Sequence, residues 1–286
     1  MKIPFQIDLT GKTVVITGAG GVLCSSFAEA LAETGAKIAL LDLRFEAADA
    51  VAEKIRQSGK IAKAYGCNVL DRESLNEAKK AIDSDLGPCD ILINGAGGNN
   101  PKGTTTKEYL FPEDLDEETT KDITTFFDLD PKGIEFVFNL NFLGTLLPTQ
   151  VFARDMAKRE NPLILNVSSM NAFRPLTKIP AYSGAKAAVS NLTAWLAVHF
   201  SKVGIRCNAI APGFFVTNQN RGLLMNADGS LTPRSEKILA ATPMGRFGEA
   251  DELLGTLLWL CDTKASGFVN GIVVPVDGGF SAYSGV

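Results

Sequence analysis

A tyrosine and a lysine four residues apart, Tyr182 and Lys186, form a pattern suited to proton transfer. On a helix, residues four apart share a face, so the phenol and the ammonium would point into one pocket. A free phenol has a pKa of about 10, and a nearby cation lowers that pKa by favouring the phenolate. Ser169 ends the apolar run 163–169 and could place its hydroxyl at the same site. A Tyr–Lys pair alone is common, but the three residues together predict a site that holds and protonates a substrate oxygen.

The scarcity of histidine limits the alternatives for proton chemistry. His199 is the only histidine, and it lies inside the apolar stretch 195–200, where we expect it to pack. A Ser-His-Asp triad centred elsewhere and most histidine-rich metal sites are therefore excluded, and we expect no metal. Proton transfer must fall to tyrosine, lysine or carboxylates.

A glycine-rich turn, Thr-Gly-Ala-Gly-Gly-Val-Leu-Cys at residues 17–24, follows the first predicted strand and opens a helix. Glycines there let the backbone approach a pyrophosphate, and the helix N-terminus offers free N–H groups. The second predicted strand ends at Asp42, whose carboxylate could accept the ribose hydroxyls of NAD and would repel the 2′-phosphate of NADP. A turn-capping role for Asp42 is the alternative. The neighbouring cation Arg44 leaves NADP open, although the pattern favours NAD.

Composition indicates a globular protein of one domain. The chain has 286 residues, 45% of them hydrophobic, and a formal net charge of −4 with scattered basic residues, which does not favour nucleic acid as a partner. Five widely spaced cysteines without a CxxC pair suit reduced thiols, so we expect a cytoplasmic protein. The N-terminus lacks a signal-peptide core, and no run approaches the roughly 18 apolar residues of a membrane span.

Strands and helices that could position these residues alternate along the chain. Strands are predicted at 13–17, 37–41, 61–66, 91–94, 163–167, 206–210 and 271–275. Helices are predicted near 22–34, 45–58, 72–85, 133–158, 180–203 and 249–261. Buried strands each followed by a helix predict an α/β fold, a doubly wound parallel sheet of about seven strands with helices on both faces. Residues 1–286 then form a single domain.

Two long stretches, near 98–132 and 214–248, interrupt this alternation. Both follow strands, so both lie at the carboxyl edge of the sheet, where such folds bind ligands. Within the first, residues 107–122 hold seven acidic residues and two lysines. We expect a solvated, partly helical flap anchored by Phe126 and Phe127, with a divalent-cation site as the alternative.

These features together resemble the short-chain dehydrogenase/reductase family along essentially the whole chain. The family's Tyr-x-x-x-Lys and serine fall on Tyr182, Lys186 and Ser169, and its fourth catalytic residue, an asparagine in the long central helix, falls on Asn141. The resemblance implies a single Rossmann-type domain. It also implies a cofactor-binding set drawn from the glycine turn, the strand ends, the Tyr–Lys helix and a Pro-Gly motif: Gly18, Gly20, Gly21, Val22, Leu23, Asp42, Asn68, Val69, Asn94, Ala96, Gly97, Tyr182, Lys186, Pro212, Gly213 and Thr217.

The sequence departs from the family pattern at three places. Val22 and Cys24 stand where the glycine turn has its last two glycines, and Asn68 stands where the family has an aspartate near the adenine. Gly95 replaces the second asparagine of the strand-end motif Asn-Asn-Ala-Gly. None of these departures changes a proton-transfer residue. They affect the expected geometry of the nucleotide-binding loops and do not affect the expected proton transfer.

A closer resemblance is to the subgroup described as D-mannonate oxidoreductases, or fructuronate reductases, carried by residues 17–24, 168–178, 243–248 and 280–286. It implies hydride transfer between NADH and the C5 ketone of a hexuronate. Gluconate 5-dehydrogenases share much of it. The substrate would contact Ser169, Tyr182, Asn171 and Asn99, with Arg174 as first candidate for the carboxylate and Asn100, Lys178 and Arg221 as weaker candidates.

The same resemblance leaves two alternative functions to consider and predicts an oligomeric state. A 3-oxoacyl-carrier-protein reductase has similar motifs, but the acidic flap and the loop amides argue against an acyl groove with a basic docking patch. An NAD-sensing protein without activity would have no need of all four catalytic residues in register. The helix 135–156 is apolar nearly all round, and family members commonly assemble through this helix and the Tyr–Lys helix, so we expect a homotetramer.

Overall fold

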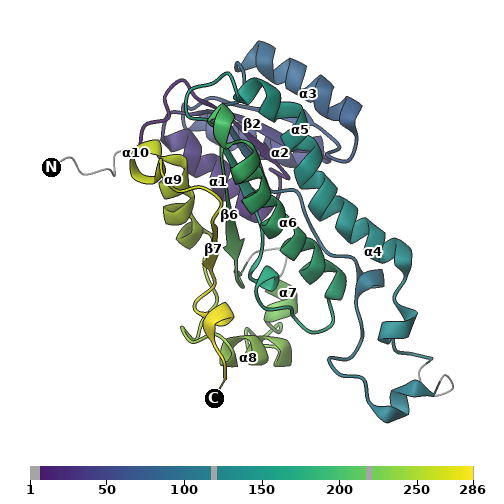
Figure 1. The fold of residues 1–286 in the computed structure, drawn as a ribbon. Helices are drawn as coiled ribbons and strands as arrows, with labels where there is room; N and C mark the ends of the chain where they lie inside the picture. The colour runs from purple at the N-terminus through teal and green to yellow at the C-terminus, as the bar shows by residue number, and fades with distance from the viewer. Residues whose placement is uncertain (1–6, 117–120, 217–220, 286) are drawn as a thin grey trace.

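A seven-stranded parallel sheet forms the centre of the molecule (Figure 1), in a computed structural model that describes residues 7–116, 121–216 and 221–285. The strand order is β3-β2-β1-β4-β5-β6-β7, with the crossover between β3 and β4 that defines a doubly wound sheet. The strands are β1 Thr13–Thr17, β2 Lys37–Asp42, β3 Ala62–Gly66, β4 Ile91–Asn94, β5 Leu163–Val167, β6 Arg206–Pro212 and β7 Val273–Val276. The predicted fold class is confirmed.

Helices cover both faces of the sheet, because alternate side chains of each central strand are buried on opposite sides. Val14 and Ile16 of β1 pack with one set of helices, while Val15 packs with the other. The first set comprises α1 Val22–Glu33, α2 Phe45–Gln57 and α9 Leu254–Cys261. The second set comprises α3 Arg72–Asp85, α5 Gly144–Met156 and α6 Pro180–His199. Burial on both faces explains why the strands read as continuous apolar runs.

The long central helix contains a π-helical turn that the sequence did not predict. It runs as α4 Pro131–Phe138, the π-helical segment η4 Asn139–Leu143 and α5 Gly144–Met156. Its 26 residues are long and apolar enough to cross a membrane, contrary to the expectation that no run approaches such a span, with a mean hydropathy of 1.3 over the most apolar window. Half of that window is buried inside the protein, as in the core helix of a soluble domain.

The two long stretches leave the carboxyl ends of β4 and β6, as predicted, but each contains short helices. The second holds α7 Arg221–Leu224 and α8 Pro233–Ala240. The first holds the 3-10 turns η1 Pro101–Gly103, η2 Pro112–Leu115 and η3 Phe126–Asp128. We call residues 104–128 the arm, which extends away from the sheet beyond the start of α4 (Figure 1).

The arm is not anchored by its two phenylalanines, so that prediction is wrong. Phe126 and Phe127 are 66% and 68% exposed. Attachment comes from polar contacts instead: the Thr105 N–H donates to the Lys178 carbonyl at 2.9 Å, and Glu108 pairs with Lys237 of α8 at 2.9 Å. The arm is therefore held to the loop before α6 and to α8.

Candidate active site

Tyr182 and Lys186 lie one turn apart at the start of α6. Pro180 occupies the first position of that helix, where its missing N–H costs nothing. The Lys186 ammonium donates to the Val167 carbonyl at 2.8 Å, at the end of β5, and lies 5.7 Å from the centre of the Tyr182 ring. The two side chains share one face of α6 at the carboxyl edge of the sheet, as the spacing predicts.

Ser169 joins this pair from the end of β5. Its backbone is extended, its side chain is buried, and its hydroxyl accepts a hydrogen bond from the Asn171 N–H at 3.3 Å. The Ser169 hydroxyl also lies near enough to the Tyr182 phenol to lower the pKa of that phenol. The three residues on which the sequence hypothesis depends therefore meet in one place.

The pKa of Tyr182 differs in direction from the sequence expectation. Burial raises this pKa above the ordinary value of 10.0, and the nearby Ser169 hydroxyl opposes the rise only in part. Burial lowers the pKa of Lys186 from 10.5 to about 8, with nearby Cys24 opposing that shift. The expected acidification of the phenol by Lys186 is thus not found. A phenol that keeps its proton at neutral pH is suited to act as the acid in carbonyl reduction.

Asn141 reaches the site from the π-helical turn. Its side chain is fully buried, and its amide donates to the carbonyls of Val137, at 2.8 Å, and Gly98, at 2.7 Å. A methyl group placed on Gly97 would lie 2.7 Å from the Asn141 Oδ1 and 3.2 Å from the Lys186 Nζ, so both atoms border Gly97. Single π turns occur often at functional sites, because they redirect one side chain without ending the helix.

A cavity of about 380 Å³ extends from this region along the carboxyl ends of β1, β2 and β4. Nine of the predicted cofactor-binding residues line it: Gly18, Gly21, Val22, Leu23, Asp42, Asn68, Val69, Ala96 and Gly97. Gly18 has a φ of 65°, and a Cβ there would lie 2.8 Å from the Ala96 Cα, so only glycine fits. The glycine-lined walls suit the close backbone approach that a dinucleotide pyrophosphate requires.

Asp42 both caps a turn and lines the cavity. Its two carboxylate oxygens accept hydrogen bonds from the Gly20 and Arg44 N–H groups, each at 2.9 Å. A Cβ on Gly20 would lie 2.6 Å from the Ala47 side chain, so Gly20 packs on α2 and holds Asp42. Asp42 can therefore cap the turn and still accept hydrogen bonds from a ligand in the cavity, because a carboxylate oxygen can accept more than one hydrogen bond.

Four other predicted cofactor residues are not among those that line this cavity, and one of the four lies outside the residues that the structure describes. The buried Asn94 amide donates to Thr149 at 3.0 Å and Asn166 at 2.9 Å, which ties β4 to α5 and β5. Pro212 ends β6, and a Cβ on Gly213 would lie 2.6 Å from Asp277. Thr217 lies outside the described residues.

The predicted substrate residues are only partly brought together. Asn171 is buried beside Ser169, and its Oδ1 has no hydrogen-bond partner among the described residues. Arg174 is exposed and its Nε donates to the Ser281 carbonyl at 3.0 Å. The Asn99 amide, also exposed, donates to Thr104 at 3.1 Å. Asn171 therefore accompanies Ser169 and Tyr182, whereas Arg174 and Asn99 contact neighbouring loops.

Two departures from the family pattern prove to be one matched exchange. A Cβ on Gly95 would lie only 2.2 Å from the Cys24 sulfur, and 2.9 Å from the Thr17 carbonyl. The thiol of Cys24 thus occupies space that a side chain at position 95 would need. Both departures are visible in the sequence, but the contact between them is not, because 71 positions separate them.

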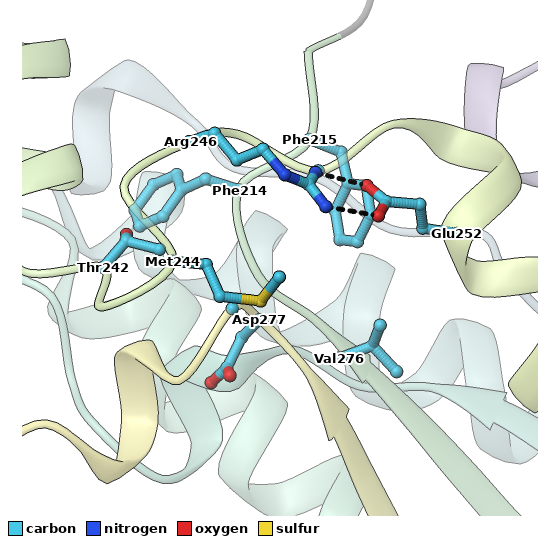
Figure 2. A pocket seen from close by; sticks show the side chains of 10 residues that line it. Phe214, Phe215, Thr242, Met244, Arg246, Glu252, Val276 and Asp277 are labelled. Carbon is cyan, nitrogen blue, oxygen red and sulfur yellow. Dashed lines mark hydrogen bonds and ion pairs between the residues drawn. The ribbon is translucent and has the colours of Figure 1, made fainter.

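A second cavity, of about 170 Å³, lies beside the end of β6 (Figure 2). Phe214, Phe215, Asp277 and Arg246 are among its lining residues. Figure 2 shows the Arg246 guanidinium facing Glu252, to which it donates two hydrogen bonds at 2.7 and 2.6 Å. Because its guanidinium is already paired with Glu252, Arg246 stabilises the loop before α9.

The fold and the site define a dinucleotide-dependent dehydrogenase, with a glycine-lined nucleotide cavity leading to a Ser-Tyr-Lys constellation. The family model for short chain dehydrogenases matches residues 12–227, and the chain belongs to that family. The chain is accordingly an oxidoreductase of the kind that acts on CH–OH groups.

Similar proteins cover the chain almost completely. An uncharacterized oxidoreductase from Haemophilus influenzae is 65% identical over 286 residues, covering 100% of this chain and 99% of the relative. A solved structure of a candidate D-mannonate oxidoreductase from Haemophilus influenza, with bound NAD, is 66% identical with a TM-score of 0.93, covering 98% of each chain. Gluconate 5-dehydrogenase from Gluconobacter oxydans is 32% identical, covering 98% of this chain and 99% of the relative.

Proposed function

We propose that this protein is an NAD-dependent oxidoreductase that interconverts the C5 alcohol of a hexonate and its ketone, with D-mannonate and D-fructuronate as the pair. The observation that carries the proposal is the convergence of Asn141, Ser169, Tyr182 and Lys186 beside the cavity lined by Asp42. The Haemophilus relative with bound NAD and the similarity to a gluconate 5-dehydrogenase support the cofactor and the substrate class.

In the proposed mechanism, Ser169 and Tyr182 hold the reacting oxygen, and Tyr182 transfers the proton. Bound NADH supplies the hydride for reduction, and NAD accepts it in the reverse direction. Burial keeps the phenol protonated at neutral pH, so Tyr182 enters the reduction as an acid. Lys186 would hold the nicotinamide ribose, and Asn141 would fix a water through which the proton is replaced.

The nucleotide would occupy the cavity of about 380 Å³. Gly18 and Gly21 would allow the backbone to approach the pyrophosphate, and Asp42 would accept the ribose hydroxyls. The remaining lining residues would follow the adenosine, with Pro212, Gly213 and Thr217 assigned to the nicotinamide end. On the substrate side, Asn171, Arg174 and Asn99 would contact the hydroxyls and the carboxylate.

A homotetramer in the cytoplasm, with residues 1–286 as one domain, is part of the proposal. Phe136, Phe138 and Leu143 are large apolar residues of the central helix, and each is 36% exposed or more. Burial of such side chains against a second copy would remove them from water. The five cysteines are buried as free thiols, which suits a reducing compartment.

A substrate and cofactor screen tests the proposal directly. Absorbance in the NADH band is followed with D-mannonate, D-gluconate, D-altronate and an acetoacetyl thioester, each with NAD and NADP. We expect the highest kcat/KM for D-mannonate with NAD. Preference for D-gluconate would make the protein a gluconate 5-dehydrogenase, and preference for the thioester would indicate an acyl reductase. Binding of NADH without turnover of any substrate would indicate a nucleotide-sensing protein.

A further inference from the structure

Lys178 holds an unusual backbone conformation at the edge of the active site. It lies between Ser169 and Tyr182 in the chain, and its φ of 71° is in the left-handed region, which residues other than glycine rarely adopt. Its carbonyl accepts the Thr105 N–H of the arm at 2.9 Å. Residues in such conformations persist where surrounding contacts hold them, and they cluster at ligand-binding sites. The base of the Lys178 side chain is therefore held at a defined position four residues before the catalytic phenol.

An ion pair between the arm and α8 lies beside this loop. Lys237 of α8 pairs with Glu108 of the arm at 2.9 Å. The pKa of Glu108 is lowered mainly by this hydrogen bond, and the charge of Lys178 lowers it further. Lys178 thus lies close enough to act on the Glu108 carboxylate, although only Lys237 pairs with it. The Glu108 carboxylate is therefore paired with Lys237, and Lys178 acts on it without contact.

Lys178 also differs from the arginine that the sequence favoured. Arg174 donates from its Nε to the Ser281 carbonyl, a contact that ties down the C-terminal segment. Lys178 makes no side-chain hydrogen bond or ion pair within the described parts of the chain, and it is only partly exposed. A partly buried ammonium without a partner is favourable where an anionic ligand completes its contacts.

We propose that Lys178 is the specificity-determining residue that binds the substrate carboxylate. The proposal rests on the proposed function, which supplies a substrate with one carboxylate. In a hexonate, three carbons separate the carboxylate carbon from C5, so the carboxylate of a substrate held by Ser169 and Tyr182 would lie within reach of the loop that joins these two residues. The Glu108–Lys237 pair joins the arm to α8 next to Lys178.

Substitution of Lys178 tests the proposal with a charged substrate and a neutral one. Each variant is assayed with D-mannonate and with D-mannonamide, which keeps the hydroxyls and lacks the charge. Lys178→Asn removes the cation and retains a residue that tolerates left-handed φ; Lys178→Arg keeps the charge. We expect Lys178→Asn to lose about 10- to 100-fold in kcat/KM for the acid, mostly through KM, and less than threefold for the amide. Lys178→Arg should keep the wild-type ratio within a few-fold.

Matched variants separate this role from a general defect. Lys202→Met, on the 3-10 turn η6 Ser201–Val203, should leave the acid-to-amide ratio of kcat/KM unchanged, and Arg174→Met tests the arginine that the sequence favoured. A ratio that collapses in Arg174→Met and survives in Lys178→Asn overturns the assignment of Lys178.

The two proposals fail in different ways. Wild-type enzyme that oxidises neither D-mannonate nor another hexonate overturns the proposed function, and the assignment of Lys178 with it. Wild-type enzyme that prefers the acid, with the same preference in Lys178→Asn, overturns the assignment alone. Because every comparison is a ratio of two substrates on one variant, a loss of folded protein cancels.

Discussion

The nucleotide side of this molecule and its substrate side are built in different ways. The nucleotide side consists of the ends of β1, β2 and β4, where backbone groups, glycines and buried side chains line the cavity. The substrate side consists of the arm and residues 214–248, joined by the Glu108–Lys237 ion pair, and the arm exposes aromatic side chains such as Tyr109 and Phe127. Sheet register fixes the first side, whereas contacts between loops fix the second.

This difference assigns different tasks to the two sides. Catalysis needs groups held within a fraction of an ångström, and the buried contacts of Lys186 and Asn141 supply that rigidity. Recognition of one sugar acid among many needs positions that can change without disturbing the sheet, and loops supply them. Substitutions on the nucleotide side should therefore affect chemistry and stability, while those on the substrate side should affect selectivity.

The largest difference in kcat between the two sides is expected when one tyrosine hydroxyl is removed from each. Tyr182→Phe removes the proton donor and should lower kcat by about 10²- to 10⁴-fold, with NADH affinity nearly unchanged. Tyr109→Phe makes the same chemical change on the arm, at a side chain that is 67% exposed, and should leave kcat within twofold. Steady-state rates and NADH fluorescence titration measure both quantities. Full activity in Tyr182→Phe would show that another group delivers the proton.

An intermediate effect is expected where the nucleotide side is packed most tightly. Gly95→Asn restores the residue usual in the family but drives a side chain into the Cys24 sulfur, 2.2 Å from the added Cβ. Overpacking of this kind typically lowers the free energy of unfolding by about 1–3 kcal/mol. Cys24→Gly in the same chain should recover at least half of that loss in urea unfolding, the rest reflecting the Thr17 carbonyl at 2.9 Å.

Gly98→Ala is the matched control for that exchange. A Cβ on Gly98 meets only the Leu140 side chain, at 3.6 Å, which is an ordinary contact. Its stability should stay within about 0.5 kcal/mol of wild type. If the losses of Gly95→Asn and Cys24→Gly simply add in the double variant, the two positions are independent and the matched exchange is refuted.

The same contrast determines what could be predicted from the sequence. The doubly wound parallel sheet and the meeting of Ser169, Tyr182 and Lys186 follow from local patterns, because parallel strands bring their carboxyl ends to one edge. The π turn at Asn141 was not predicted, and the Asn141 amide that it positions donates to the Gly98 carbonyl in another loop, a contact that no local pattern shows. The direction of the Tyr182 pKa shift was missed because the motif shows the nearby cation and not the burial.

A gradual effect is expected in how stability depends on pH. Burial lowers the pKa of Lys186 to about 8 from 10.5. Between these values the unfolded chain carries a proton on Lys186 that the folded protein lacks, so the free energy of unfolding should rise with pH in this window. Lys186→Met removes that contribution. The wild-type minus variant difference should therefore grow by up to about 1.4 kcal/mol per pH unit from pH 8 to 10.

Only the difference between the two proteins is informative, because other buried groups titrate in the same range. Burial raises the pKa of Cys24, of Cys89 and of Tyr182, and each of these makes stability fall as pH rises, but equally in both proteins. Urea unfolding at pH 7.5, 8.5 and 9.5 measures the slope, with Lys178→Met as the control from the substrate side. A difference that stays constant across these pH values would place the Lys186 ammonium in contact with water, and the rigid, dry character inferred for the nucleotide side would then not extend to its catalytic lysine.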